Sequence, residues 1–375
     1  MRACDSILPL LAAEFSVSKG VAAQTISGFA VAYGLLQFFY GPLADRLGKL
    51  RVMTVAVALC ALANTLISVA PSLELVTLAR AFAGAAGGGI VPLSIALIGD
   101  TVAYRERQET LSRLMVVTIS GLIAGQWLGG LVADWLGWRL LFAGLAAGFA
   151  VLVWPMRRAQ SRIPAPPAEV PGEARPTLLG QLKRLLRRRW ARSILALVAL
   201  EGAFAFATIS FVPVTLNQTF GLSIARSGAV MALFGVGGLA YALGARALIA
   251  RLGERRMALT GGVIVGLGMA IIALAPRWEW AALGCFLGGV GLYMMHNTLQ
   301  ANASQMMPAI RGTSVAMFAA CFFSGQSIGV AVEALVIDAG SPRAMFAAAS
   351  LALPLLGAYF AWGLRRRDAW QGADG

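Results

Sequence analysis

Residues 41–53 read Gly-Pro-Leu-Ala-Asp-Arg-Leu-Gly-Lys-Leu-Arg-Val-Met, and this short charged stretch separates two long apolar segments. Gly48 supplies the conformational freedom that a tight turn needs, and Gly41 lets the preceding helix pack close to a neighbour. Asp45 can accept hydrogen bonds from N–H groups at a helix N-terminus or pair with an arginine. The stretch therefore predicts a tight polar loop between two membrane helices.

The overall composition agrees with a membrane protein. The chain is 58% hydrophobic and 13% charged, with a mean hydropathy of +0.75, which excludes a water-soluble globule of this length. Its 43 glycines suit helices that pack through small residues. The net charge of +14 does not indicate nucleic-acid binding, because the basic residues lie at the ends of apolar segments and act as topology signals.

Apolar runs divide the chain into an all-α set of membrane spans. Each run is long enough to cross about 30 Å of hydrocarbon at about 1.5 Å per residue. The predicted spans are 21–40, 52–70, 73–99, 109–134, 137–156, 190–219, 226–249, 257–275, 279–304, 312–337 and 343–364.

The distribution of Lys and Arg predicts the orientation of these spans. If the loop at 41–51 faces the cytoplasm, the loops and tail on that side hold 24 of the 31 basic residues, and the opposite side holds five. This asymmetry follows the positive-inside rule. We therefore expect a multi-pass protein of a cytoplasmic or inner membrane with a cytoplasmic C-terminus.

A proline-rich and basic stretch separates two domains. We expect an N-terminal helical half at 1–156, a cytoplasmic linker at 157–189 and a C-terminal helical half at 190–375. The prolines predict an extended tether, and the basic end of the linker predicts an amphipathic segment on the anionic inner leaflet.

The two halves repeat each other at a nearly constant offset. Phe82-Ala83-Gly84 matches Phe286-Leu287-Gly288 at 204 residues, and Arg46-Leu47-Gly48 matches Arg251-Leu252-Gly253 at 205. The offset predicts two six-helix halves related by an axis along the membrane normal. In the second copy of the loop, Ala250 stands in the place of Asp45.

The repeat also predicts that the first span is shortened. The span that begins near Trp190 starts well before Pro213, so the counterpart that contains Pro9 should start upstream of Met1. Residues 1–15 therefore correspond to the second half of a span and lack the features of a signal peptide. We attribute this to a start codon assigned too late or to a truncated chain.

Four stretches resemble the major facilitator superfamily of transporters. The loop at 41–51 is similar to its signature G-x-L-a-D-R-x-G-r-k. Residues 80–87 resemble its R-x-x-q-G-x-g-a motif with Ala83 in place of the glutamine, and residues 2–15 resemble the end of the first helix in bacterial exporter-like members. Residues 121–130 resemble the G-P-x-x-G-G motif of drug/proton antiporters, but Gln126 replaces the proline that is associated with a kinked helix. The resemblance implies an alternating-access carrier similar to bacterial drug and metabolite efflux permeases. It also implies a gating loop made of Gly41, Asp45, Arg46, Gly48, Lys49 and Arg51.

Few titratable groups lie within the spans, and these are the candidates for proton coupling. Asp5 and Arg80 fall at a similar depth and could pair, so that protonation would break the pair. Glu201 lies about 16 Å into its helix by residue counting, where His296, the only histidine, could reach it. Glu333 lies near a helix end, where we expect it to be solvated.

Amide and aromatic side chains within the spans are candidates for the substrate cavity. Amides would form hydrogen bonds with the substrate and aromatic rings would supply apolar walls. The candidates are Gln37, Gln126, Trp127, Phe204, Tyr293, Asn297, Gln300 and Gln326.

Other classes of protein lack support in the sequence. No G-x-x-x-x-G-K-[ST] loop is present for ATP. With one histidine and four scattered cysteines, no metal site or disulfide is predicted. We therefore expect neither an enzyme nor a cofactor, and the proton gradient is the driving force.

The sequence favours a monomeric secondary transporter in the lipid bilayer that exports a small amphiphilic organic molecule in exchange for protons. Two alternatives remain open at this point. One is proton-coupled uptake of a sugar or organic acid, and the other is a non-transporting carrier that has lost the start of its first span.

Overall fold

The computed structural model describes residues 3–160, 178–307 and 310–372, and these residues form helices joined by short turns. The N-terminal half comprises α1 (Ala3–Glu14), α2 (Lys19–Ala22), α3 (Gln24–Leu47), α4 (Lys49–Ser68), α5 (Leu73–Gly87), α6 (Ile90–Thr101), α7 (Tyr104–Leu136) and α8 (Trp138–Gln160). The C-terminal half follows α9 (Leu178–Arg187). It comprises α10 (Arg189–Glu201), the π-helix η1 (Gly202–Phe206), α11 (Ala207–Ser210), α12 (Val212–Phe220), α13 (Ile224–Leu274), α14 (Trp278–Ala303), α15 (Arg311–Asp338) and α16 (Pro342–Gly372).

The described residues hold nine helical stretches that are long and apolar enough to cross a membrane. One of them, α13, runs for 51 residues and is broken at Gly253, whose φ of 68° lies outside the helical region, so it makes two spans. With the shorter α1 and with α14, the helices follow the predicted order. The structure therefore confirms the all-α membrane fold that the apolar runs predict.

The loop at 41–51 is shorter than predicted. Helix α3 continues through Gly41 to Leu47, and Gly48, with a φ of 90°, is the single residue between α3 and α4. A side chain at Gly41 would meet no atom within 4 Å. The expectation for Gly48 is thus confirmed, whereas the expectation that Gly41 allows a close helix approach is wrong.

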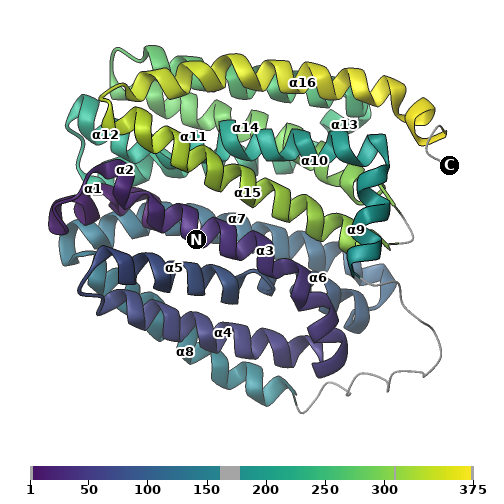
Figure 1. Cartoon of the computed structure of the whole chain (residues 1–375), viewed down its shortest axis with the longest axis horizontal. Coiled ribbons are helices and arrows are strands. Elements are labelled where there is room, and N and C mark those ends of the chain that lie inside the picture. The colour runs from purple at the N-terminus through teal and green to yellow at the C-terminus, as the bar shows by residue number, and fades with distance from the viewer. Residues whose placement is uncertain (1–2, 161–177, 308–309, 373–375) are drawn as a thin grey trace.

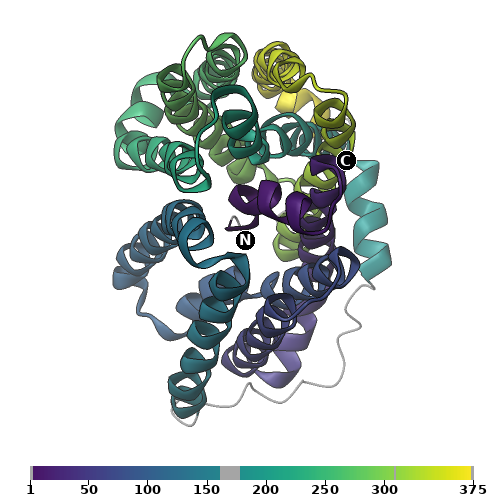
Figure 2. The ribbon, with the colours of Figure 1, turned by 90° about the vertical axis from the view of Figure 1, so that its left-hand side faces the viewer.

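Figure 1 shows the helices of the two halves running roughly side by side, with α3–α8 below and α10–α16 above, and Figure 2 shows the same bundle from one end. We call the end that contains Gly48 and Gly253 the loop end, and the other end the closed end. Helix α9 lies at the loop end, where its Gln181 contacts Thr313 of α15. Residues 161–177, which contain the proline-rich part of the predicted linker, lie outside the described residues.

Equivalent contacts in the two halves bear out the repeat in atomic detail. A side chain at Gly84 would overlap the carbonyl of Phe29, and one at Gly289 would overlap the carbonyl of Phe234. Nη2 of Arg139 donates to the carbonyl of Ala70 at 2.9 Å, and Nη2 of Arg343 donates to that of Ala275 at 3.2 Å. Each pair is separated by 204 or 205 residues, as the sequence repeat predicts.

The two halves meet at the closed end through two related contacts. Asp338, at the end of α15, accepts from the backbone N–H of Gly20 at 2.9 Å and from Oγ of Ser18 at 2.6 Å. Asp134, near the end of α7, accepts from the backbone N–H of Ala225 at 3.3 Å. In each case a carboxylate of one half binds the N-terminus of a helix in the other half, a favourable arrangement for the helix dipole. We call these two contacts the latches.

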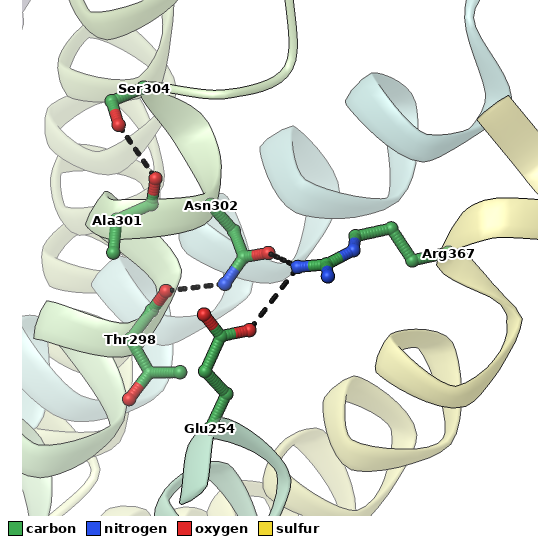
Figure 3. Close-up of polar contacts among 6 residues, drawn as sticks. All are labelled: Glu254, Thr298, Ala301, Asn302, Ser304 and Arg367. Atoms are coloured by element: carbon green, nitrogen blue, oxygen red, sulfur yellow. Dashed lines mark hydrogen bonds and ion pairs between the residues drawn. The ribbon is translucent and has the colours of Figure 1, made fainter. Parts of the chain in front are cut away.

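At the loop end the C-terminal half is held by a separate polar cluster. Figure 3 shows Arg367 of α16 between Glu254, one residue after Gly253, and Asn302 of α14. Nη1 of Arg367 lies 3.2 Å from both Oε2 of Glu254 and Oδ1 of Asn302, and Nδ2 of Asn302 donates to the carbonyl of Thr298 at 3.0 Å. The cluster joins α13, α14 and α16.

Candidate functional site

The structure brings Glu201 and His296 together within the C-terminal half. Nδ1 of His296 lies 2.7 Å from Oε2 of Glu201. The Glu201 side chain is fully buried, whereas that of His296 is 20% exposed. The pair thus joins a fully buried carboxyl to an imidazole that is partly exposed. An acid and a base in hydrogen-bond contact can exchange a proton when the surroundings of either one change.

A π-helix directly after Glu201 shapes this position. Gly202–Phe206 adopt π-helical hydrogen bonding between α10 and α11, a feature that is frequent at functional sites. A side chain at Gly202 would overlap the carbonyl of Phe322, so only glycine lets α10 approach α15 this closely. Gly325 of α15 makes the same kind of close contact with the carbonyl of Ala199. The glycines therefore press the backbone beside Glu201 against α15.

Aromatic rings surround the imidazole and continue into the other half. His296 lies 5.5 Å from the ring centre of Phe318 and 5.0 Å from that of Phe322. Phe322 contacts Phe323 at 5.1 Å, and Phe323 meets Tyr33 of α3 edge-on at 4.6 Å. The chain of rings therefore runs from the Glu201–His296 pair to the N-terminal half. Such rings provide large apolar surfaces with polar edges, which suits an amphiphilic ligand.

The amide candidates divide into two groups. Gln126 and Gln326 are fully or almost fully buried, and their side-chain oxygens have no hydrogen-bond partner among the described residues. Gln37, Asn297 and Gln300 are partly or well exposed, and Asn297 hydrogen-bonds to Tyr241. Gln126 lies where α1 meets α7, because its backbone carbonyl accepts from Oγ of Ser6. Gln326 therefore lies on α15, the helix that flanks His296, whereas Gln126 lies on α7.

The aromatic candidates also lie in different surroundings. Tyr293 contacts Phe234, which in turn contacts Phe206 of the π-helix. Phe204 is partly buried within the π-helix. Trp127 lies on α7 and is 49% exposed. Tyr293 and Phe204 thus belong to the C-terminal half that holds the Glu201–His296 pair.

The second predicted pair, Asp5 and Arg80, lies inside the N-terminal half. Both side chains are buried, at 1% and 4% exposed, and both lie close enough to the Cys4 thiol to interact with it electrostatically. The Arg80 guanidinium lies 4.3 Å from the ring centre of Phe29. Such a cation–π contact lowers the cost of a buried arginine.

The prediction that Glu333 is solvated is wrong. We expect it from its position to be solvated, but it is only 7% exposed and one of its carboxyl oxygens accepts from Oγ1 of Thr208. The reason is that α15 packs this face against α11 instead of turning it to solvent.

The predicted gating loop is mostly exposed. Asp45, Arg46 and Arg51 are exposed, and Lys49 forms an ion pair with Asp100 at the end of α6. An apolar groove of about 230 Å³ lies beside the loop between α3 and α4, with Arg51 at its edge. The groove is lined by α3 and α4 and holds neither member of the Glu201–His296 pair.

Sequence reasoning did not identify several residues of the site, namely Tyr33, Thr208, Phe318, Phe322 and Phe323. Phe318 and Phe322 are four residues apart, so they share one helix face. That spacing was visible in the sequence, but only the structure shows that the face meets His296.

A membrane bundle of two repeated halves is typical of secondary transporters. The sequence profile of the Major Facilitator Superfamily matches residues 4–308 and again 195–374. The chain belongs to this superfamily, whose members are transporters and not enzymes.

The chain is also similar to individual members of the superfamily. It is 26% identical over 334 residues to the uncharacterized transporter YceJ of Bacillus subtilis, covering 87% of this chain and 82% of YceJ. It is 28% identical over 241 residues to the purine ribonucleoside efflux pump NepI of Escherichia coli, covering 64% of this chain and 55% of NepI. The fold matches a crystal structure of a mutant of the nucleoside transporter NupG with a TM-score of 0.80 and 15% identity, covering 96% and 94% of the two chains.

Proposed function

We propose that this protein is a proton-coupled antiporter that exports a small amphiphilic organic molecule across a cytoplasmic membrane. The observation that carries the proposal is the buried Glu201 in contact with the partly exposed His296. A buried ionisable residue in a membrane helix is costly and is a functional-site candidate by default. In an antiporter, such a group binds a proton in one state of the cycle and the substrate replaces the proton in the other.

The aromatic rings beside His296 support the choice of substrate class. The surfaces of Phe318, Phe322 and Tyr33 would bind the apolar part of a ligand, and Gln326, Asn297 and Gln300 would bind its polar groups. NepI, an efflux pump for purine ribonucleosides, carries a substrate of this mixed character. A planar nucleoside-like or drug-like molecule is therefore the substrate that we favour.

The latches support alternating access with a defined starting state. We assign the loop end to the cytoplasm, because the basic residues of the sequence concentrate there. With this assignment the latches hold the halves together at the extracytoplasmic end, and we propose that in this state the site opens towards the cytoplasm. One chain supplies both halves, so a monomer in the lipid bilayer suffices for the cycle.

The direct test is accumulation of ethidium, chloramphenicol and purine nucleosides in an efflux-deficient bacterium that expresses the chain, with and without a protonophore. Lower accumulation of any of these compounds, reversed by the protonophore, is the expected result. A Glu201→Gln variant at equal membrane abundance serves as the matched control. Higher accumulation driven by the gradient would instead indicate uptake. Equal accumulation with and without the protein would contradict the proposal.

A further inference from the structure

Glu333 is a second buried carboxyl of the C-terminal half. Its Oε1 accepts from Oγ1 of Thr208, and its Oε2 is buried and has no hydrogen-bond partner among the described residues. An ionised carboxylate in such surroundings is expensive, because water no longer solvates the charge and the Thr208 hydroxyl is a donor to only one of its two oxygens. A bound proton removes the charge and gives the carboxyl a donor of its own.

Among the described residues, no positively charged group pairs with Glu333 to neutralise an ionised carboxylate. The charged groups at the same end of α15 and of the elements packed against it are Lys19 on α2, Glu279 on α14, Asp338 on α15 and Arg343 on α16. Among the described residues none of them forms an ion pair or a hydrogen bond with Glu333. The carboxylate of Asp338 is already engaged by Ser18 and Gly20, and the guanidinium of Arg343 donates to Ala275. The elements packed against α15 carry further charged groups nearer the middle and the loop end of the bundle. These groups are Asp45 and Arg46 on α3, Lys183, Arg184 and Arg187 on α9, Arg189, Arg192 and Glu201 on α10, His296 on α14, and Arg365, Arg366 and Arg367 on α16.

The contact between α10–α11 and α15 connects Glu333 with the pair at Glu201. Glu201 and Thr208 are seven residues apart on one side, and Gln326 and Glu333 are seven residues apart on the other. On α15, seven α-helical residues return to the same face after a rise of about 10 Å, whereas the stretch from Glu201 to Thr208 contains the π-helix and does not follow this spacing. Gly202 and Gly329 bring the two backbones into close contact along this length, since a side chain at either would overlap the opposite chain. We call this contact the seam.

The seam holds three buried oxygens that lack a donor. They are Oε1 of Glu201, Oε1 of Gln326 and Oε2 of Glu333, and none has a hydrogen-bond partner among the described residues. Buried polar atoms are almost always satisfied in folded proteins, so three such acceptors along one contact indicate that protons or water molecules occupy it. The π-helix lies on the same seam.

We propose that Glu333, hydrogen-bonded to Thr208, is a second proton-binding site, and that protons pass along the seam between Glu333 and the Glu201–His296 pair. The direction in which the protons move, from the extracytoplasmic end to the cytoplasm, rests on the proposed function. When the latches open, a proton from the extracytoplasmic water binds Oε2 of Glu333. It then moves to the Glu201 carboxyl, which leaves Glu333 ionised and ready for the next proton. The proton leaves through the imidazole of His296 to the cytoplasm, so that only O–H and N–H bonds form and break.

The first experiment needs no substrate. Purified protein in nanodiscs is titrated with pH while infrared spectroscopy follows the C=O stretching band of protonated carboxyls. We expect Glu333→Gln to remove one component of the band and Thr208→Val to shift it, because the hydroxyl bond is lost. At neutral pH, where a solvated carboxyl is ionised, Glu74→Gln, at an exposed carboxyl of the same end, should leave the band unchanged. A band that is identical in the wild type and in Glu333→Gln at every pH would overturn the proposal.

The second experiment separates this proposal from the proposed function. Glu333→Gln should abolish the protonophore-sensitive part of export, and Glu333→Asp, which keeps a carboxyl, should restore part of it. Thermal unfolding of each variant establishes that the fold is intact. Full gradient-driven export by Glu333→Gln would overturn the route along the seam. If the wild type exports none of the compounds but the infrared component is present, the proposed function fails and the proton site stands.

Discussion

Gly84 in the N-terminal half and Gly289 in the C-terminal half make the same close contact, one with the carbonyl of Phe29 and the other with that of Phe234. Arg139 and Arg343 donate to equivalent carbonyls, and the two latches are equivalent as well. The contacts that hold the helices together and join the two halves at the closed end are thus present in both copies of the repeat.

The buried ionisable groups, in contrast, are not shared at the positions that can be compared. At the offset of the latches, Glu333 corresponds to Gly129 and Thr208 to Cys4, and the stretch that corresponds to His296 is the apolar Val91-Pro92. The N-terminal half instead buries Asp5 and Arg80, whose counterparts in the other half are apolar or glycine. Residues that hold the scaffold therefore follow the repeat, whereas Glu333, His296, Asp5 and Arg80 do not.

The largest effect should come from the pair itself. Glu201→Gln keeps the size and the hydrogen bond but cannot exchange a proton, so we expect it to abolish the protonophore-sensitive export of the compound identified above. Asp5→Asn sharpens the comparison between the halves. Loss of coupling in Glu201→Gln alone would assign coupling to the C-terminal half, and loss in both variants would mean that both halves titrate. Unchanged gradient-driven export in both would refute the assignment of coupling to either pair.

The shared contacts should respond equally in the two halves. Gly84→Ala and Gly289→Ala would each force apart two helix backbones, and overpacking of this kind costs about 1–3 kcal/mol. We expect a similar fall in the melting temperature of both variants in detergent. Gly41→Ala is the matched control, because its side chain would meet no atom within 4 Å and alanine favours a helix. A fall in the melting temperature of only one variant would show that the two equivalent contacts do not contribute equally to stability.

The sequence predicted the scaffold well because its signals are local. Apolar length, glycines at turns and the constant offset need no knowledge of which helix faces which, and Gly48 and Gly253 adopt the positive φ that the repeated loop requires. The contact between Glu201 and His296 was also expected from residue counting. The burial of Glu333 did not, because one sequence does not reveal which face of α15 packs against α11. The same limit hid the ring contacts of Phe318 and Phe322.

The latches should have a smaller effect than the close contacts, because their carboxylates are exposed and screened by salt. A carboxylate at a helix N-terminus contributes about 0.3–1 kcal/mol. We expect Asp338→Asn to shift the protein towards an open extracytoplasmic end more than Asp134→Asn does, because Asp338 accepts two hydrogen bonds and Asp134 one. Equal shifts would show that the additional hydrogen bond from Ser18 does not stabilise the closed state.

Spin labels at Val69 and Leu274 would measure this shift. The two positions are exposed, equivalent in the repeat and located at the ends of α4 and α13. The labels are introduced as cysteines in a chain whose four native cysteines have been replaced. Pulsed distance measurements should show a larger fraction of long distances in each variant, and Glu74→Gln should show none of this change. High salt should reduce the difference, since it screens exposed charges.

The smallest effects should come from the ion pairs at the loop end, where the two halves use opposite charges. Lys49 follows Gly48 and pairs with Asp100, whereas Glu254 follows Gly253 and pairs with Arg367. Exposed pairs contribute about 0.2–1 kcal/mol, so double-mutant cycles with Lys49→Met and Asp100→Asn, and with Glu254→Gln and Arg367→Met, should give coupling energies in this range. Arg367→Met alone should cost more than Lys49→Met, because Arg367 also holds Asn302 (Figure 3). If Lys49→Met destabilises the protein more, Lys49 stabilises the folded state by more than its ion pair with Asp100. The opposite charges at Lys49 and Glu254 would then contribute unequally to the stability of the two halves.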